Sequence, residues 1–338
     1  MLKTFIPEAV PGLRKPLFLV SNPEGGSHLF QTIPRDEFAG IIREVPDVRD
    51  ADVVIAPHEY ADLLKHPAQF EQYRSLARDA GKRLLLSAYQ DDNAPIRAED
   101  AIVLRPGAYR SKLAPNEVIM PPYIEDIGKI HGILPLGKGD VPTVGFVGKA
   151  GFAGARERVR YAIRNFVLQH GAERTGVYFR RHALKVLKLD SRIRLSAIVR
   201  SSFSANRKTV EVPPEVARRE YIDNIKNNLF TLAPRGDGNF SFRFFEALSA
   251  GRIPVLIETD NALPLEDRIK YDEFIVRCPW QHMSELPERI YRFWSERSDS
   301  ELRAVQQKAR EAFETYLYAP AFFRTVFTPE YLSSIPEV

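Results

Sequence analysis

The chain has 338 residues, too many for one ordinary hydrophobic core and suited to two domains of about 100 to 200 residues each. Apolar residues make up 44% of the chain and charged residues 27%, a balance that excludes a long disordered region. The net charge of +4 is too small to indicate a nucleic-acid partner, and the single cysteine, Cys278, excludes both a disulfide framework and a thiolate metal cluster.

The N-terminal segment lacks the pattern of a targeting signal. Pro7, Pro11 and Pro16 precede an apolar run of only four residues, 17–20, which is far shorter than a signal-peptide core or a membrane span. We therefore expect a cytoplasmic protein, with peripheral contact at the inner face of the membrane as one option.

The first half of the chain predicts a parallel sheet. Short apolar runs separated by helical or loop segments are typical of strands buried on both faces, and they lie at 16–21, 51–57, 82–89, 101–106 and 117–122. Residues 59–81 predict a helix that is interrupted near Pro67 and stopped by Gly81. Residues 127–140 are glycine-rich without a clear period, so we expect them to be a linker.

A second alternating series follows the linker. The expected strands are 143–148, 175–179, 194–201, 229–234 and 253–257, and the expected helices are 155–171, 180–189, 213–228, 241–251 and about 298–318. The fold class is therefore α/β, with two Rossmann-like domains facing each other across a cleft. We expect the domains at residues 1–135 and 140–320, with a tail, 321–338, for which packing on the N-terminal domain is one option.

The segment from Pro234 to Ile257 carries the strongest functional signal. A strand ends there, a glycine-rich loop follows, and a helix begins, so the helix N-terminus points into the cleft. Free backbone N–H groups at that end suit an anion, and Ser241 or Asn239 can cap the helix. Arg235 and Arg243 add planar donor groups that match phosphate.

Glu246 follows Arg243 by three residues and shares its face of the helix. Its carboxylate can accept hydrogen bonds from ribose hydroxyls, as acidic residues do in dinucleotide-binding folds. A phosphate at the helix tip with a ribose beside it predicts a nucleotide. The alternative is a solvated Arg243–Glu246 salt pair without a functional role.

Residues 221–276 resemble the nucleotide-sugar half of exostosin-type glycosyltransferases. The shared pattern is a strand, Pro-Arg-Gly, a helix with Ser-x-Arg-x-x-Glu-Ala, and a strand with Gly-x-x-Pro-Val. A looser, collinear similarity extends the resemblance over about residues 16–290, through 50–60, 84–93, 118–126 and 141–151.

The resemblance implies a GT-B fold and the transfer of a sugar from a nucleotide diphosphate sugar with inversion, without a tightly held metal or other cofactor. By motif position it implies donor binding by Arg235, Gly236, Ser241, Arg243 and Glu246. The chain departs from the animal enzymes in its short length, in lacking a membrane anchor and lumenal cysteines, and at position 252, where an arginine stands in place of a frequent cysteine. These departures indicate a soluble microbial relative that builds surface polysaccharide.

The catalytic base is expected on the N-terminal, acceptor-side domain, opposite the donor. Asp92 and Glu59 are our candidates, because a carboxylate whose pKa rises in a closing cleft can take the acceptor proton. His28, His58 and Asp91 are further acceptor-side candidates at strand ends. For each of these residues a loop or capping role is the alternative.

Two further positively charged features are open to two interpretations each. Lys149 follows a glycine turn that lacks P-loop spacing, and it either contacts phosphate or is solvated. Residues 180–194 form a basic stretch that is either the solvated face of a packed helix or a patch for anionic lipid or a lipid diphosphate-linked acceptor.

The sequence thus predicts an inverting glycosyltransferase whose partners are a nucleotide-sugar donor and a glycan or lipid-linked acceptor, with no nucleic acid. One alternative is a fucosyltransferase-like GT-B enzyme that uses a guanine nucleotide sugar. The other is a non-catalytic module that binds nucleotide sugar or glycan.

Overall fold

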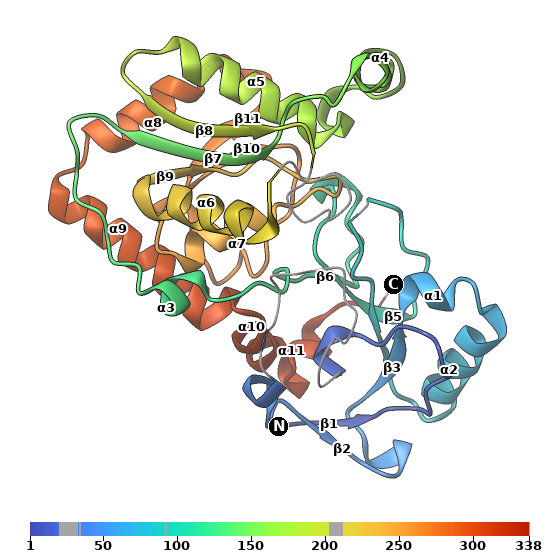
Figure 1. Cartoon of the computed structure of the whole chain (residues 1–338). Coiled ribbons are helices and arrows are strands. Elements are labelled where there is room, and N and C mark those ends of the chain that lie inside the picture. Colours follow the sequence, from blue (N-terminus) through green and yellow to red (C-terminus); the bar gives the residue numbers. More distant parts are fainter. Residues whose placement is uncertain (20–32, 34, 92, 203–211, 338) are drawn as a thin grey trace.

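The computed structural model describes residues 1–19, 33, 35–91, 93–202 and 212–337, and it contains two lobes (Figure 1). The first lobe holds a six-stranded parallel sheet in the order β2-β1-β3-β4-β5-β6. The second holds a five-stranded parallel sheet in the order β11-β10-β9-β7-β8. The expected fold class, α/β with two Rossmann-like domains in the GT-B arrangement, is confirmed.

The first lobe comprises the elements up to α3. Its strands are β1 (Leu2–Phe5), β2 (Ile42–Glu44), β3 (Val53–Glu59), β4 (Leu84–Ser87), β5 (Ala101–Arg105) and β6 (Glu117–Ile119). Its helices are α1 (Tyr60–Leu63) and α2 (Pro67–Asp79), and α3 (Ile127–His131) leads towards the second lobe. Every residue of β3, β4 and β5 is buried, as expected for strands covered on both faces.

The second sheet is built from β7 (Thr143–Lys149), β8 (Arg194–Arg200), β9 (Phe230–Leu232), β10 (Ile253–Glu258) and β11 (Val276–Pro279). Its helices are α4 (Ala155–Ile163), α5 (Gly176–Leu189), α6 (Pro214–Asn227), α7 (Phe242–Ser249), α8 (Leu286–Ser295) and α9 (Asp299–Ala312). The chain ends with α10 (Ala319–Val326) and α11 (Pro329–Ser334). Within the described ranges, none of these helices has the length and apolar character needed to cross a membrane.

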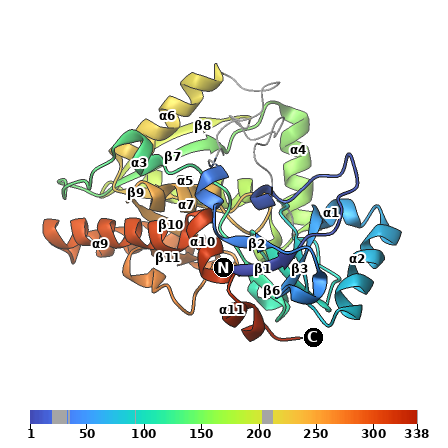
Figure 2. The same ribbon diagram turned by 90° about the horizontal axis from the view of Figure 1, so that it is seen from below.

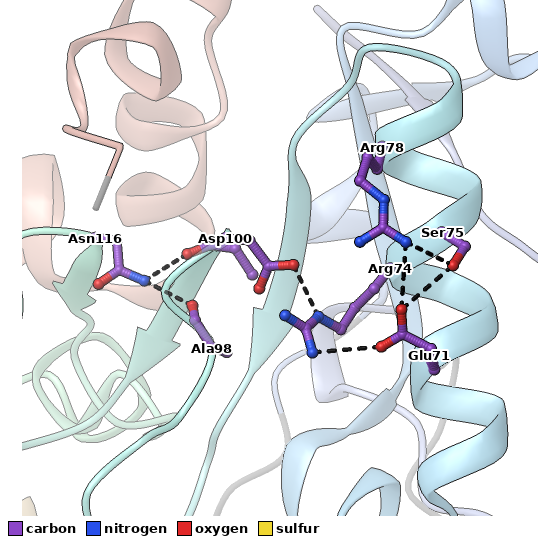
Figure 3. Close-up of polar contacts among 8 residues, drawn as sticks. Glu71, Arg74, Ser75, Arg78, Ala98, Asp100 and Asn116 are labelled. Atoms are coloured by element: carbon purple, nitrogen blue, oxygen red, sulfur yellow. Dashed lines mark hydrogen bonds and ion pairs between the residues drawn. The ribbon is translucent and has the colours of Figure 1, made fainter.

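Polar contacts fix α2 and the start of β6 in the first lobe (Figure 3). Arg74 on the outer face of α2 donates from Nε to Asp100, 2.8 Å away, and pairs with Glu71 on its own helix. The buried Asn116 donates from Nδ2 to the carbonyl oxygens of Ala98 and Ala101, at 2.8 and 2.7 Å. The turn before β5 is thereby tied to the next strand.

Two predicted strands are wrong. Residues 17–19, within the expected strand 16–21, form a 3₁₀ turn, and the N-terminal strand of the sheet is β1 instead, which lies between β2 and β3. The ring of Phe18 packs on Phe323 and Phe327, at 4.9 and 5.4 Å between ring centroids. This apolar run therefore covers α10 (Ala319–Val326) rather than joining a sheet.

The segment 175–179 is also helical, because α5 begins at Gly176. Phe179, Ala183 and Leu187 are buried and lie four residues apart, which is the spacing of one helix face. The expected strand 175–179 and helix 180–189 are therefore a single helix, since a short apolar run has no period of its own to separate the two structures.

The C-terminal segment returns to the first lobe. In Figures 1 and 2, α10 and α11 lie beside the N-terminus rather than beside the second sheet. The ring of Phe323 stacks on Tyr123, 6.1 Å between centroids, and Arg83 donates to the carbonyl oxygens of Leu332 and Ile335, at 3.1 and 2.6 Å. The tail thus contributes to the core of the lobe in which the chain begins.

Arg252 is 1% exposed and lies against the C-terminal ends of α6 and α7. Its guanidinium donates to the amide oxygen of Gln306 and to the main-chain carbonyls of Leu134, Ile225, Lys226, Ala250 and Gly251, at 2.8 to 3.3 Å. Four of these carbonyls belong to the C-terminal ends of α6 and α7, where the helix dipole favours a cation. Burial lowers the pKa of Arg252 to about 10, still well above neutrality.

Replacing Arg252 with Met is expected to lower the free energy of unfolding by about 3 kcal/mol or more, because several buried carbonyls lose their donor. The matched control is Arg303→Met on α9, where a half-exposed ion pair with Asp299 contributes less than about 1 kcal/mol. Urea denaturation followed by circular dichroism measures both losses. Equal losses in the two variants would contradict a structural role for Arg252.

Candidate functional site

A pocket of about 320 Å³ lies between the two lobes. The first lobe supplies Asp91, Asn93, Tyr109 and Lys112 to its lining, and the second supplies Arg164, Gln169, Glu173, Thr175, Arg235 and Asp237. Three carboxylates and three cationic groups face one space. Such a lining suits a polar ligand with several hydrogen-bonding groups.

The loop between β9 and α7, residues 235–239, is bonded to the first lobe. The carboxylate of Asp91 accepts from the backbone N–H of Gly238 at 2.8 Å, and the side-chain oxygen of Asn93 accepts from the N–H of Asn239 at 2.7 Å. Asn239 in turn donates from Nδ2 to the carbonyl of Ala108 at 3.2 Å. The predicted glycine-rich loop is therefore held in place from across the pocket.

Arg235 lies at the boundary between the lobes and is 4% exposed. Its Nη1 donates to the hydroxyl of Tyr109 at 2.6 Å and to the carbonyl of Ala172 at 2.9 Å, and its Nη2 donates to the carbonyl of Asp237 at 2.6 Å. Its Nε is buried and has no hydrogen-bond partner among the described residues. Arg235 thus positions the loop and keeps one donor free.

Arg180 is a second buried arginine at this site, and it was not among the predicted donor residues. It donates to the carbonyls of Lys149 and Arg235, at 3.2 and 3.1 Å, and so joins the ends of β7 and β9. Burial, together with the positive charge of Arg243, lowers the pKa of Arg180 to about 10. The expectation of a solvated face for 180–194 is wrong at this position. The sequence signal for the burial of Arg180 is that it directly follows Phe179, which lies on the buried side of α5.

Arg243 lies in the first turn of α7 and points back to β7. Its Nη2 donates to the carbonyl of Val147 at 2.6 Å, and its guanidinium covers the ring of Phe146 at 4.6 Å from the centroid. A Cβ on Gly148, in β7, would come within 2.8 Å of that Nη2, so the glycine leaves room for Arg243.

The three guanidinium groups form a cluster, defined here as the arginine cluster of Arg180, Arg235 and Arg243. Burial lowers the pKa of Arg180, and the positive charges of Arg243 and Arg235 lower it further. Among the described residues, the Nε of all three is buried without a hydrogen-bond partner. Buried donors of this kind usually bind a water molecule or a ligand, and here the excess charge favours an anion.

Glu246 projects towards α6 rather than towards Arg243. It accepts from the hydroxyl of Tyr221 and from Arg218, whose Nη1 lies 3.4 Å away, and Arg218 also pairs with Glu125 at 2.9 Å. Glu246 and Arg243 are therefore not the solvated salt pair of the alternative interpretation. The hydroxyl of Tyr221 shows that the Glu246 carboxylate is placed to accept from an O–H group.

The remaining predicted donor residues have mainly structural contacts. Ser241 is the N-cap of α7 by backbone position and makes no side-chain capping bond. The N–H of Gly236 donates to the carbonyl of Phe240 at 2.8 Å. Lys149 pairs with Glu157 at 2.6 Å, so it is engaged rather than freely solvated.

The candidate bases of the first lobe lie in different surroundings. Glu59 is 6% exposed, accepts from Ser87 Oγ at 3.0 Å and from the N–H of Tyr89 at 3.1 Å, and is not part of the pocket lining. Burial raises its pKa to about 7. Asp91 does line the pocket, and burial raises its pKa although the bond from Gly238 opposes that effect.

Within the described part of the chain, the other acceptor-side candidates add no residue to the pocket lining. His58 is fully buried and its Nε2 accepts from the N–H of Val10 at 2.9 Å, so it holds the N-terminal segment rather than facing the pocket. His28 and Asp92 lie outside the described residues. In the described part of the chain, no group of three or more His, Cys, Asp or Glu side chains is arranged to hold a metal ion.

Comparison with known proteins supports the resemblance seen in the sequence. Residues 173–292 match the Exostosin GT47 domain, which confirms the predicted resemblance over this part of the chain. Exostosin-1 of Drosophila melanogaster is 32% identical over 102 residues, covering 30% of this chain and 13% of the relative. The Exostosin-1 homolog of Caenorhabditis elegans is 33% identical over 103 residues, covering 30% and 26%. The match thus spans only a small part of these relatives.

Among solved structures, TarM gives a TM-score of 0.40 at 10% identity, covering 83% of this chain and 55% of that one. AviGT4, a glycosyltransferase involved in avilamycin A biosynthesis, gives 0.35 at 12% identity and covers 99% of both chains.

The buried Glu59 predicts a pH-dependent stability. Below its ordinary pKa of 4.5 the carboxyl is protonated in both the folded and the unfolded chain, so burial of Glu59 carries no ionisation cost there. As the pH rises towards about 7, only the unfolded chain ionises and stability falls. Between about pH 5 and pH 8, the wild type is expected to lose about 2 to 3 kcal/mol more than Glu59→Gln in urea denaturation. Parallel pH profiles of the two proteins would contradict this assignment.

Proposed function

We propose, from the premise that residues 173–292 form an exostosin GT47 domain, that this protein transfers a sugar from a nucleotide diphosphate sugar to a glycan or lipid-linked acceptor with inversion. The observation that carries the proposal is the arginine cluster, in which three guanidinium groups each keep a buried, unpaired Nε among the described residues, beside an interdomain pocket. We retain surface polysaccharide as the proposed product class and the cytoplasm as the proposed location.

The diphosphate of the donor would bind at the arginine cluster. Arg180 and Arg243 meet there at the end of β7, and the N-terminal turn of α7 adds backbone N–H groups. In a buried site of low dielectric, these groups would stabilise the charge that develops on the leaving diphosphate. Glu246 would accept a ribose hydroxyl in the manner in which it accepts the hydroxyl of Tyr221.

Asp91 is the base that the pocket supports best. It lies on the first lobe, opposite the arginine cluster, and its raised pKa makes it a stronger proton acceptor than an ordinary aspartate. In the transfer step the acceptor hydroxyl gives its proton to Asp91, its oxygen bonds to the anomeric carbon, and the bond from that carbon to phosphate breaks with its electron pair on the diphosphate. Glu59 is bonded to Ser87 and Tyr89 and does not line the pocket.

Nucleoside diphosphate binding tests the donor half of the proposal. In a thermal-shift screen of uridine, guanosine, cytidine and thymidine diphosphates, we expect one or more to stabilise the wild type. The apparent affinity should fall by more than about tenfold in both Arg243→Ala and Glu246→Ala, each of which removes a charge-assisted contact. Arg74→Ala, on α2 and outside the pocket lining, is the matched control and should bind as the wild type does. Equal binding by all four proteins would contradict the assignment, and a preference for guanosine diphosphate would favour the fucosyltransferase-like alternative.

Substitution of Asp91 tests the catalytic half. Asp91→Asn retains an oxygen for the N–H of Gly238 but cannot accept a proton, so turnover should fall by about 10² to 10⁴-fold while diphosphate affinity changes little. Release of nucleoside diphosphate from the donor measures turnover. The wild-type rate should decline at acidic pH as Asp91 is protonated, and the variant should lack that decline. Unchanged turnover would show that another group is the base, and no turnover by the wild type with any donor would favour a binding module.

A further inference from the structure

Helix α4 and the turn after it expose an unusual amount of apolar surface. In Figure 1, α4 projects from the upper lobe, and none of its residues is buried. The exposed fractions are 59% for Val159, 48% for Ile163, 57% for Phe166, 66% for Val167 and 70% for Leu168. These five side chains lie within ten consecutive residues, so they form a local apolar surface rather than scattered exposures.

A row of arginines runs beside this apolar surface. Arg156, Arg160 and Arg164 follow one another at intervals of four residues, and all three are exposed. Residues four apart lie above one another on a helix, so this row borders the row made by Val159 and Ile163. We call residues 155–168 the α4 surface.

The charge of the α4 surface is strongly positive. It carries four arginines, at 156, 158, 160 and 164, and one carboxylate, Glu157, which pairs with Lys149 at 2.6 Å. Exposed apolar side chains with arginines beside them are the composition of helices that lie in the interface of an anionic membrane. The apolar groups enter the acyl boundary, and the guanidinium groups bind lipid phosphates.

A second copy of the chain fits the α4 surface less well. A two-fold dimer through this face would place the same patch of both copies together, and the arginines would repel one another. An anionic lipid surface has the opposite charge, so its contact adds electrostatic attraction to the burial of apolar groups.

The α4 surface leads directly to the interdomain pocket. Arg164, at the end of the arginine row, lines that pocket together with Gln169. We propose that the α4 surface docks on anionic lipid membranes and thereby brings the mouth of the pocket to the lipid headgroups. If the protein is a transferase, this geometry favours a lipid-linked acceptor, and that consequence rests on the proposed function. Membrane docking itself does not depend on the proposed function.

This surface differs from the basic stretch 180–194 that the sequence suggested for membrane contact. In that stretch Arg180 is buried, and Arg192 is paired with Asp190 and Glu288, each at 2.8 Å. Among the described residues, the stretch 180–194 exposes one large apolar side chain, Leu189, whereas the α4 surface exposes five.

Vesicle co-sedimentation tests the proposal. We expect the wild type to bind vesicles of an equimolar mixture of phosphatidylcholine and phosphatidylglycerol, and not vesicles of phosphatidylcholine alone. Arg156→Glu with Arg160→Glu, and Val159→Asp with Ile163→Asp, should each lower binding by more than about tenfold. The matched control is Leu64→Asp with Arg78→Glu, which alters equally exposed residues of the first lobe and should bind as the wild type does.

Failure of the wild type to bind mixed vesicles would overturn the proposal, as would α4 variants that bind as the control does. A wild-type dimer that Val159→Asp with Ile163→Asp converts to monomer, without vesicle binding, would overturn it in favour of a second copy. Thermal unfolding of each variant verifies the fold. Diphosphate binding measured on the same variants should be unchanged, so a failed donor proposal and a failed membrane proposal give different results.

Discussion

The geometry of the candidate site depends on the bonding of the loop 235–239 to both lobes. Asp91 and Asn93 accept its backbone N–H groups from the first lobe, and Arg180 donates to its first carbonyl from the second. Because these bonds use main-chain groups, they fix the path of the loop whatever its side chains are. The start of α7 and Arg243 are placed by that path, at the edge of the sheet where β7 and β9 end.

Buried positive charge is handled in this chain mainly by carbonyl oxygens. Arg252 meets the carbonyl ends of α6 and α7. Arg180 meets carbonyls at the ends of β7 and β9, and Arg235 meets the loop carbonyls of Ala172 and Asp237. The two cases differ in the number of guanidinium donors that remain unpaired. Arg252 has its Nε and both Nη atoms bonded, whereas Arg180 and Arg235 keep an unpaired Nε within the part of the chain that the structure describes. The first arrangement stabilises the fold, and the second leaves capacity for an anion.

The sequence allowed most of the strands and the helix α7 to be predicted, because buried strands and an apolar helix that ends at a glycine have local patterns. It did not allow the partners of the site residues to be predicted. Val147, which receives the bond from Arg243, lies 96 residues away in the chain. Arg180 looked solvated because it stands in a run of basic residues, and only the packing of α5 shows that it is buried. The strand β1 was missed because its polar residues, Lys3 and Thr4, interrupt the apolar run.

The most direct test of the account is a crystal structure of the protein with a bound nucleoside diphosphate. The account predicts that the phosphates lie within hydrogen-bonding distance of the guanidinium groups of Arg180 and Arg243, with the ribose near Glu246. Phosphates bound elsewhere, with the arginine cluster filled only by water, would contradict it.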